Sequence, residues 1–183
     1  MKILSTSIEG VFTVETSLLP DNRGSFSRLF CERELGSAFG GRKVVQINKS
    51  ITATPGTVRG IHYQNPPHAE MKLIRCTSGR VWDVAVDLRA GSSTFLQWHA
   101  EELTSENARM LVISEGCGHG FQVLEPDSEL LYLHTAFYNP EFESGVMYND
   151  PKLAITWPLP ALDLSARDQK YPPISTDFTG IKV

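Results

Sequence analysis

Basic side chains are outnumbered in this chain of 183 residues: 17 Lys and Arg stand against 21 Asp and Glu, a formal net charge of −4. Nucleic-acid-binding proteins usually present a basic surface, so we expect no nucleic-acid partner. No apolar run approaches the roughly 18 residues that a membrane helix requires, and the amino terminus turns polar at Ser5 before a signal-peptide core can form. We therefore expect a cytoplasmic protein with no membrane partner.

Cysteine and histidine are scarce, and neither shows a metal-binding spacing. The three cysteines are an odd number without a C-x-x-C pair, which is typical of reduced, buried thiols. The five histidines include no H-x-H or H-x-x-x-H pair, and the position two residues after His62 is Gln64. A site rich in nitrogen ligands is therefore hard to assemble. Glycine-rich phosphate signatures are also absent, so we expect neither a metal nor another cofactor.

Short alternating segments dominate the chain, whereas helical patterns are few. Val81–Leu88 is the clearest alternating segment, and one helix is predicted at Cys31–Phe39, with short turns at Ser105–Arg109 and Ser165–Gln169. Many short strands separated by turns predict an all-β sandwich, jelly roll or small barrel. The other predicted strands are Gly10–Glu15, Val44–Asn48, Gly60–Gln64, Met71–Cys76, Phe95–Glu102, Arg109–Ile113, Phe121–Leu124 and Glu129–Ala136.

The length predicts a single domain over residues 1–183 that needs no metal or disulfide to be stable. The tail after Pro158 is richer in Pro and Asp than the rest of the chain. We expect this tail to wrap over the barrel.

Two neighbouring strands carry polar side chains in positions suited to chemistry. Because Thr77–Arg80 has the composition of a turn, we expect it to join the two strands in a hairpin and to bring Lys72 and Asp83 within pairing reach. The pair is either a buried ion pair or an ammonium positioned to stabilise an oxyanion. His62, on the strand before them, is by itself more often a structural residue than a catalyst.

Three further side chains each allow two interpretations. Tyr132 shares a strand face with His134, and a phenol inside a polar barrel can donate a proton to a carbanion, although a strand tyrosine more often belongs to a core. His119 is expected at the tip of a glycine-rich turn, either a plain hairpin connection or a backbone that approaches a ligand closely. Ser165–Asp168 matches the S-x-x-D form of a capping box, so Asp168 taken alone is more typical of a helix cap than of a catalyst.

The most specific motif of the chain is R-G-I-H-Y-Q at Arg59–Gln64, followed by P-P-H-A-x-x-K-L-I-R at Pro66–Arg75. With the residues described above, this motif resembles the dTDP-4-dehydrorhamnose 3,5-epimerases, sugar-nucleotide epimerases of the cupin superfamily. The similarity runs from about Gly10 to Asp168. The other matching segments are Leu19–Phe26, Gln46–Asn48, Val81–Arg89, Ile113–Phe121, Leu131–Tyr138 and Asp150–Pro158.

The resemblance implies a homodimeric, metal-free, cupin-type jelly-roll barrel that epimerises a nucleotide-linked 4-keto-6-deoxy sugar. It makes His62 the base that removes a proton next to the ketone and pairs it with Asp168. Tyr132 becomes the acid that reprotonates the opposite face, and Lys72 the donor to the enolate oxygen. The implied substrate-contacting residues are Arg23, Gln46, Asn48, Arg59, His119, Tyr138, Glu143 and Arg167, with Asp83 and Phe26 in supporting positions.

Homodimers with twofold symmetry are the commonest assemblies. We expect the segment Gly10–Glu15, apolar on one side, to pair with a partner sheet.

Several positions depart from the family pattern, and four of them bear on substrate choice. Arg28 stands where a Glu is usual, Ile47 where an acidic or amide residue is usual, Leu133 where a Lys is usual and Ser144 where an Arg is usual. We expect these departures to alter the binding pocket, and they leave open which keto sugar and nucleotide are used and whether one or two centres are inverted. The alternatives are a keto-isomerase, a single-centre epimerase on a different nucleotide sugar, or a non-catalytic sugar-binding cupin.

Overall fold

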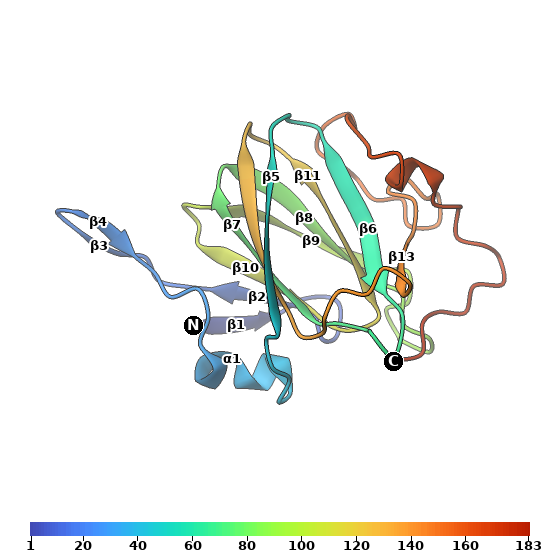
Figure 1. The fold of residues 1–183 in the computed structure, drawn as a ribbon, viewed down its shortest axis with the longest axis horizontal. Helices are drawn as coiled ribbons and strands as arrows, with labels where there is room; N and C mark the ends of the chain where they lie inside the picture. The colour runs from blue at the N-terminus through green and yellow to red at the C-terminus, as the bar shows by residue number, and fades with distance from the viewer.

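A computed structural model describes residues 1–183 as two facing antiparallel β-sheets with one short helix (Figure 1). The larger sheet has six strands in the order β1-β2-β10-β7-β12-β5, and the smaller has five in the order β13-β6-β11-β8-β9. A separate hairpin, β3-β4, extends away from both sheets (Figure 1). This arrangement confirms the predicted jelly roll. No helix is long or apolar enough to cross a membrane.

The strands are β1 (Lys2–Ser5), β2 (Phe12–Glu15), β3 (Leu19–Asp21), β4 (Gly24–Phe26), β5 (Gln46–Thr52), β6 (Val58–Gln64), β7 (Lys72–Ser78), β8 (Arg80–Asp87), β9 (Trp98–Thr104), β10 (Arg109–Ile113), β11 (Cys117–Val123), β12 (Ser128–His134) and β13 (Glu143–Gly145). The helices are α1 (Glu32–Phe39) and the 3₁₀ turn η1 (Asp168–Lys170). The predicted helix is therefore confirmed, whereas β1, β13 and the hairpin are strands that alternation alone did not indicate.

The interior between the sheets is filled partly by apolar side chains. A buried cluster joins Ile74 of β7 and Leu111 of β10 to Ala85 of β8 and Phe121 of β11. Alternate residues of β8 pack on its outer face instead, as the period-two pattern predicts. The same alternation places Lys72, two residues before Ile74, on the inner face.

Both outer faces are covered, and the coverings differ. Leu35 and Phe39 of α1 pack on the six-stranded sheet against Met110 and Leu133. Gly40 ends this helix in the left-handed conformation (φ +57°), which glycine adopts without strain. Carboxyl-terminal residues, among them Ile174, cover the five-stranded sheet. They form a second buried cluster with the outer face of that sheet.

The predicted hairpin between Met71–Cys76 and Val81–Leu88 is wrong, because β7 and β8 belong to different sheets. The connection turns at Gly79, where φ is +72° and an added Cβ would lie 2.4 Å from Ser128 Oγ. Such a turn carries the chain across the barrel. Lys72 and Asp83 therefore approach from opposite sheets rather than along neighbouring strands.

The predicted glycine-rich turn around His119 is also wrong, since this segment forms the central strand β11. A Cβ on Gly118 would lie 2.4 Å from Ile61 Cγ2, and one on Gly120 would lie 2.6 Å from Ile61 Cδ1. These glycines therefore allow β11 to lie close against β6, and only Gly116 uses the left-handed region (φ +77°). As a result His119 lies in mid-strand and is buried.

The expectation that Gly10–Glu15 pairs with a partner sheet is wrong as well. Strand β2 is hydrogen-bonded to β1 on one side and to β10 on the other, so it has no free edge. The edge strands of this sheet are β1 and β5.

The close approach of β11 and β6 predicts a specific sensitivity to added volume. Gly118→Ala should lower the free energy of unfolding by about 1–3 kcal/mol, the usual cost of overpacking, as measured by urea unfolding. Gly36→Ala is the control, because Gly36 lies on the exposed side of α1 with no atom near an added Cβ. It should raise the free energy by about 0.5–1 kcal/mol. Equal effects of the two changes would contradict this explanation.

Candidate active site

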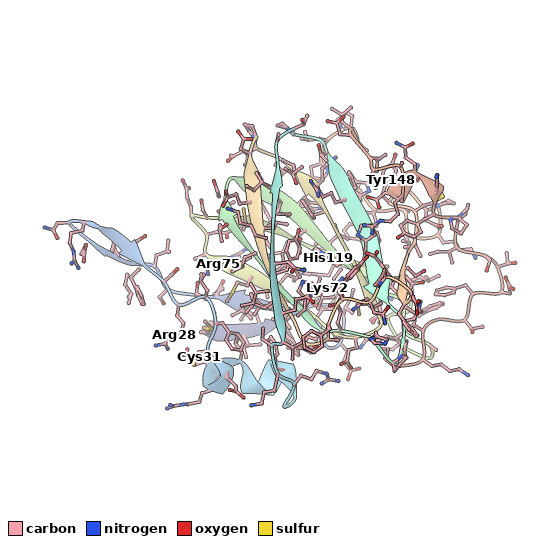
Figure 2. All side chains as sticks on the ribbon, in the orientation of Figure 1. Arg28, Cys31, Lys72, Arg75, His119 and Tyr148 are labelled. Carbon is pink, nitrogen blue, oxygen red and sulfur yellow. The ribbon has the colours of Figure 1, made fainter.

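A cavity of about 610 Å³ opens between the sheets, lined mainly by polar side chains from both of them. Figure 2 shows Lys72 and His119 in this part of the molecule. Ten of the residues singled out in the sequence line the cavity: Asn48, Arg59, His62, Lys72, His119, Tyr132, Tyr138, Glu143, Arg167 and Asp168. The topology thus brings together residues from β5, β6, β7, β11, β12, β13 and η1.

The His62 imidazole is held by the Asp168 carboxylate, with 2.6 Å between Nε2 and Oδ1. Asp168 is buried, and its Oδ2 accepts a hydrogen bond from the Gly60 amide at 3.4 Å. Burial alone would raise the pKa of Asp168, but the hydrogen bond and charge of His62 outweigh it and hold that pKa below its ordinary range. Because Nε2 faces the carboxylate, Nδ1 is the ring nitrogen without a hydrogen-bond partner and the one available as a base.

The capping interpretation of Asp168 is half right. Its backbone N–H donates to Ser165 Oγ at 3.0 Å, as in a capping box. Its carboxylate does not return to Ser165 but goes to His62 instead. The cap therefore holds the backbone of Asp168 and leaves its carboxylate available to His62.

The Tyr132 phenol projects from β12 into the cavity, and its hydroxyl lies 2.9 Å from Ser50 Oγ on β5. Burial raises the pKa of Tyr132, so the phenol stays protonated. The His119 ring meets it edge-on at a centroid distance of 6.0 Å. A protonated phenol is the state required of a proton donor.

His119 is itself held by a buried carboxylate. Its Nε2 lies 2.8 Å from Oδ1 of Asp83, whereas Asp83 Oδ2 has no hydrogen-bond partner. Burial raises the pKa of Asp83, and the charges of His119 and Lys72 oppose that effect. Asp83 therefore supports the site from behind His119, without lining the cavity.

Glu70 is a site residue that the sequence analysis missed. Its carboxylate forms an ion pair with Lys72 Nζ at 3.3 Å and lies 2.7 Å from Nδ1 of His134. His134 Nε2 in turn lies 3.3 Å from the amide nitrogen of Asn48. The available signal was spacing. Ser50 follows Asn48 by two residues on β5 and so shares its face, and Glu70 precedes Lys72, the first residue of β7, by two.

The mouth of the cavity carries a hydrogen-bonded group of charged side chains. Glu143 Oε2 accepts from Arg167 Nη1 at 2.6 Å and from the Tyr138 hydroxyl at 2.9 Å. Gln46 does not line the cavity, but its Oε1 accepts from the Tyr138 backbone N–H at 3.0 Å. Arg59 donates to the Ile51 carbonyl at 3.4 Å. Two guanidinium groups therefore reach the rim where an anionic part of a ligand would enter.

Arg23 and Phe26 do not lie in this cavity. Both belong to the β3-β4 hairpin, where the Arg23 side chain is 84% exposed and pairs with Asp21, and Phe26 is 67% exposed. Figure 2 shows Arg28 at the base of this hairpin, where it pairs with Glu34 of α1. These two residues therefore do not reach the cavity of their own chain.

Two of the four departures from the family pattern point away from the cavity, contrary to the expectation that they alter it. Ile47 is 61% exposed on the outer face of β5. Leu133 is buried against α1. Both neighbour cavity residues in sequence, and strand alternation sends them to the opposite face.

No group of three or more His, Cys, Asp or Glu side chains is arranged to hold a metal ion. Gln64, at the position where a metal-binding barrel would offer a second histidine, accepts from the Asn139 backbone N–H at 2.7 Å and donates to the His68 carbonyl at 3.1 Å. Its side chain therefore ties two loops together.

Comparison with known proteins agrees with this geometry. The family model described as dTDP-4-dehydrorhamnose 3,5-epimerase matches residues 5–176. The dTDP-4-dehydrorhamnose 3,5-epimerase of Pseudomonas aeruginosa is 44% identical over 160 residues, which cover 87% of each chain. The chain belongs to the dTDP-4-dehydrorhamnose 3,5-epimerase family. This membership confirms the predicted family and the predicted jelly-roll fold. It also confirms that the protein is an epimerase, an enzyme of the isomerase class.

Solved structures of this family are similar over nearly the whole chain. The dTDP-6-deoxy-D-glucose-3,5-epimerase RmlC of Legionella pneumophila, in complex with dTDP-4-keto-L-rhamnose, has a TM-score of 0.92 and 35% identity, covering 100% of this chain and 98% of that one. ChmJ, a 3′-monoepimerase of Streptomyces bikiniensis in complex with dTDP-quinovose, has a TM-score of 0.86 and 34% identity, covering 93% and 86%. Similar folds thus include enzymes that differ in the number of centres they invert.

The position of Glu70 predicts a pH-dependent contribution to stability. Burial alone would raise the pKa of Glu70, but His134 and Lys72 outweigh it and hold that pKa below its ordinary range. A carboxylate with a depressed pKa stabilises the fold above its unfolded pKa of about 4.5, and this stability is lost as the pH falls through its folded value. Glu70→Gln should therefore lower the free energy of unfolding by about 1.5–3 kcal/mol at pH 7 and by less at pH 3.

Urea unfolding at the two pH values measures this difference. Glu141→Gln, at an exposed position, is the matched control and should change stability little at either pH. A loss for Glu70→Gln that is as large at pH 3 as at pH 7 would contradict the assigned ionisation.

Proposed function

We propose that this enzyme inverts carbon centres next to the ketone of a nucleotide-linked 4-keto-6-deoxy sugar, with His62 as base and Tyr132 as acid. One observation carries the proposal: the two groups enter the same cavity from opposite sheets, His62 on β6 and Tyr132 on β12. Inversion requires a proton to leave one face of the sugar ring and to return on the other. Two separate side chains on facing walls meet that requirement.

The first step is removal of the α-proton by His62. Asp168 orients the ring and stabilises the imidazolium that forms, as a hydrogen-bonded carboxylate does for other histidine bases. The electrons move to the ketone oxygen, where the Lys72 ammonium stabilises the enolate. Removal of one such donor typically costs roughly 3 kcal/mol in the barrier. Tyr132 then donates its proton to the same carbon from the opposite wall.

Arg59 and Arg167 at the rim suit the diphosphate of a nucleotide sugar. Guanidinium groups bind phosphate oxygens through several parallel hydrogen bonds, and both side chains line the cavity. Asn48 and His119 line the part nearer the sugar, with Glu143 and Tyr138 at the mouth. Against a non-catalytic sugar-binding role, the base, the acid and the enolate-stabilising cation are present together.

Two variants separate the chemical roles when a dTDP-linked 4-keto-6-deoxy sugar is followed by proton NMR in heavy water. His62→Asn should reduce both deuterium uptake and inversion by at least about a hundredfold, because general base catalysis usually contributes 10²–10⁴-fold. Tyr132→Phe should keep deuterium uptake at the original configuration while losing inversion. Each α-position is followed separately, so the number of inverted centres is read in the wild type.

Folded stability and nucleotide affinity of both variants serve as controls and should stay near wild type. Inversion by Tyr132→Phe at an undiminished rate would assign the donor to another group. Absence of any exchange in the wild-type protein would favour the binding-only alternative, and movement of the ketone to another carbon would favour a keto-isomerase.

We further propose a cytoplasmic homodimer in which the β3-β4 hairpin of each chain reaches the cavity of the other. All six residues of β3 and β4 are exposed, and an isolated two-stranded hairpin is at best marginally stable in water. The turn between its two strands carries Arg23, which the family resemblance makes a substrate contact, and Phe26, in a supporting position, ends β4. A second copy related by a twofold axis covers the hairpin and brings both residues to a ligand.

Light scattering should give the mass of a dimer at micromolar concentration. Phe26→Ser should weaken nucleotide-sugar binding by about tenfold or more, because an aromatic contact in an interface contributes on the order of 2 kcal/mol. Leu162→Ser, at another exposed apolar position outside the hairpin, is the control and should leave binding unchanged. A monomeric protein with full activity would contradict the proposed assembly.

A further inference from the structure

Ser50 is the one side chain that hydrogen-bonds the Tyr132 hydroxyl, at 2.9 Å. The two residues lie on adjacent antiparallel strands, β5 and β12, where Tyr132 is paired with Asn48 and Ser50 lies diagonally across. A serine at such a diagonal position reaches the end of a tyrosine ring. The contact is therefore built into the strand register.

The chemistry proposed for Tyr132 creates a need that this contact meets. When the phenol gives its proton to carbon, its oxygen becomes a phenolate inside a cavity that disfavours charge. Burial raises the pKa of Tyr132, and the negative charge of Asp83 acts in the same direction. The positive charge of Arg59 opposes them. A hydrogen-bond donor on the phenolate oxygen would lower the cost of forming it.

Two imidazoles also lie beside the ring, and each is held by a neighbouring carboxylate. The imidazoles of His119 and His134 lie against Tyr132 with ring centroids 6.0 and 6.1 Å away. His119 is held by Asp83, and His134 by Glu70 on one nitrogen and Asn48 on the other. Ser50 is the one side chain already within hydrogen-bond distance of the Tyr132 oxygen, which makes it the donor to the phenolate.

We propose that Ser50 is a positioning residue for Tyr132, which fixes the phenol during proton donation and returns a proton to the phenolate afterwards. This inference rests on the proposed function, in which Tyr132 is the acid. The register of β5 against β12 fixes the geometry, and Ser50 itself lines the cavity, within reach of water there.

The proton balance closes without any external reagent. The enolate carbon forms a C–H bond as the Tyr132 O–H bond breaks. The phenolate then takes the Ser50 hydroxyl proton while Ser50 takes one from a cavity water. The hydroxide left from that water receives the proton that His62 removed in the first step. The cycle thus restores all three side chains and consumes no water.

The test measures inversion and deuterium uptake separately, with a dTDP-linked 4-keto-6-deoxy sugar in heavy water. Ser50→Ala should slow inversion roughly ten- to hundredfold, the effect expected for a lost hydrogen bond to a charged oxygen. Deuterium uptake with retained configuration should stay near wild type, because it depends on His62 and Lys72. A general disturbance of the cavity would lower both rates together, and that result would overturn the proposal.

Two further variants test whether the hydroxyl is the group that matters. Ser50→Thr keeps a hydroxyl on a strand position that accepts β-branched residues, and it should restore inversion to within a few-fold of wild type. Thr52→Val removes a hydroxyl two residues along the same strand face, and Thr52 Oγ1 has no hydrogen-bond partner. It should leave the ratio of inversion to uptake unchanged. Ser50→Thr as slow as Ser50→Ala, or Thr52→Val as damaging, would overturn the proposal.

Failure of this inference is distinguishable from failure of the proposed function. If Tyr132→Phe loses inversion while Ser50→Ala keeps it, only the role of Ser50 is refuted. If Tyr132→Phe inverts normally, the acid assignment fails and the role of Ser50 fails with it. The combined change should invert no more slowly than Tyr132→Phe alone, because Ser50 acts through the phenol. Additive losses would overturn the proposal.

Discussion

Each of the three imidazoles facing the cavity is hydrogen-bonded to a carboxylate, and the site depends on these pairs. His62, His119 and His134 meet Asp168, Asp83 and Glu70 at 2.6, 2.8 and 2.7 Å. A charge left unpaired in a protein interior costs several kcal/mol. A cavity lined by titratable groups between two apolar-packed sheets is therefore stable only where each group has a partner. The carboxylates come from η1, from β8 and from the segment before β7, so the pairs also join distant parts of the chain.

The pair of His62 and Asp168 links the cavity to the carboxyl-terminal segment. Residues 106 positions apart meet because this segment packs over the outer face of the five-stranded sheet and then places η1 beside β6. The Ser165 cap fixes the start of that turn. The same segment thus covers the sheet and orients the His62 ring, so loosening of the tail would affect both.

Alternation in the sequence predicted which faces of the strands carry polar groups, and it was right for Lys72 and Tyr132. It did not predict the sheet to which each strand belongs, because the turn at Gly79 has the same composition whether it closes a hairpin or crosses the barrel. The pairing of Asp168 with His62 was expected only from the family resemblance, since a partner 106 residues away leaves no local signal. Glu70 and Ser50 were missed because each acts on a recognised residue and neither belongs to a motif of its own.

Strand alternation also directs two positions that depart from the family pattern away from the cavity. Ile47 and Leu133 each stand beside cavity residues in sequence, yet both side chains lie on the outer face of the six-stranded sheet. Their differences from the family pattern therefore change a surface and a helix contact and leave the cavity wall as it is. Ser144 lies on β13 between Glu143, which lines the cavity, and Gly145. Arg28 lies at the base of the exposed hairpin. Differences in substrate choice are thus expected from the hairpin and the cavity mouth, where binding can change without moving His62, Tyr132 or Lys72.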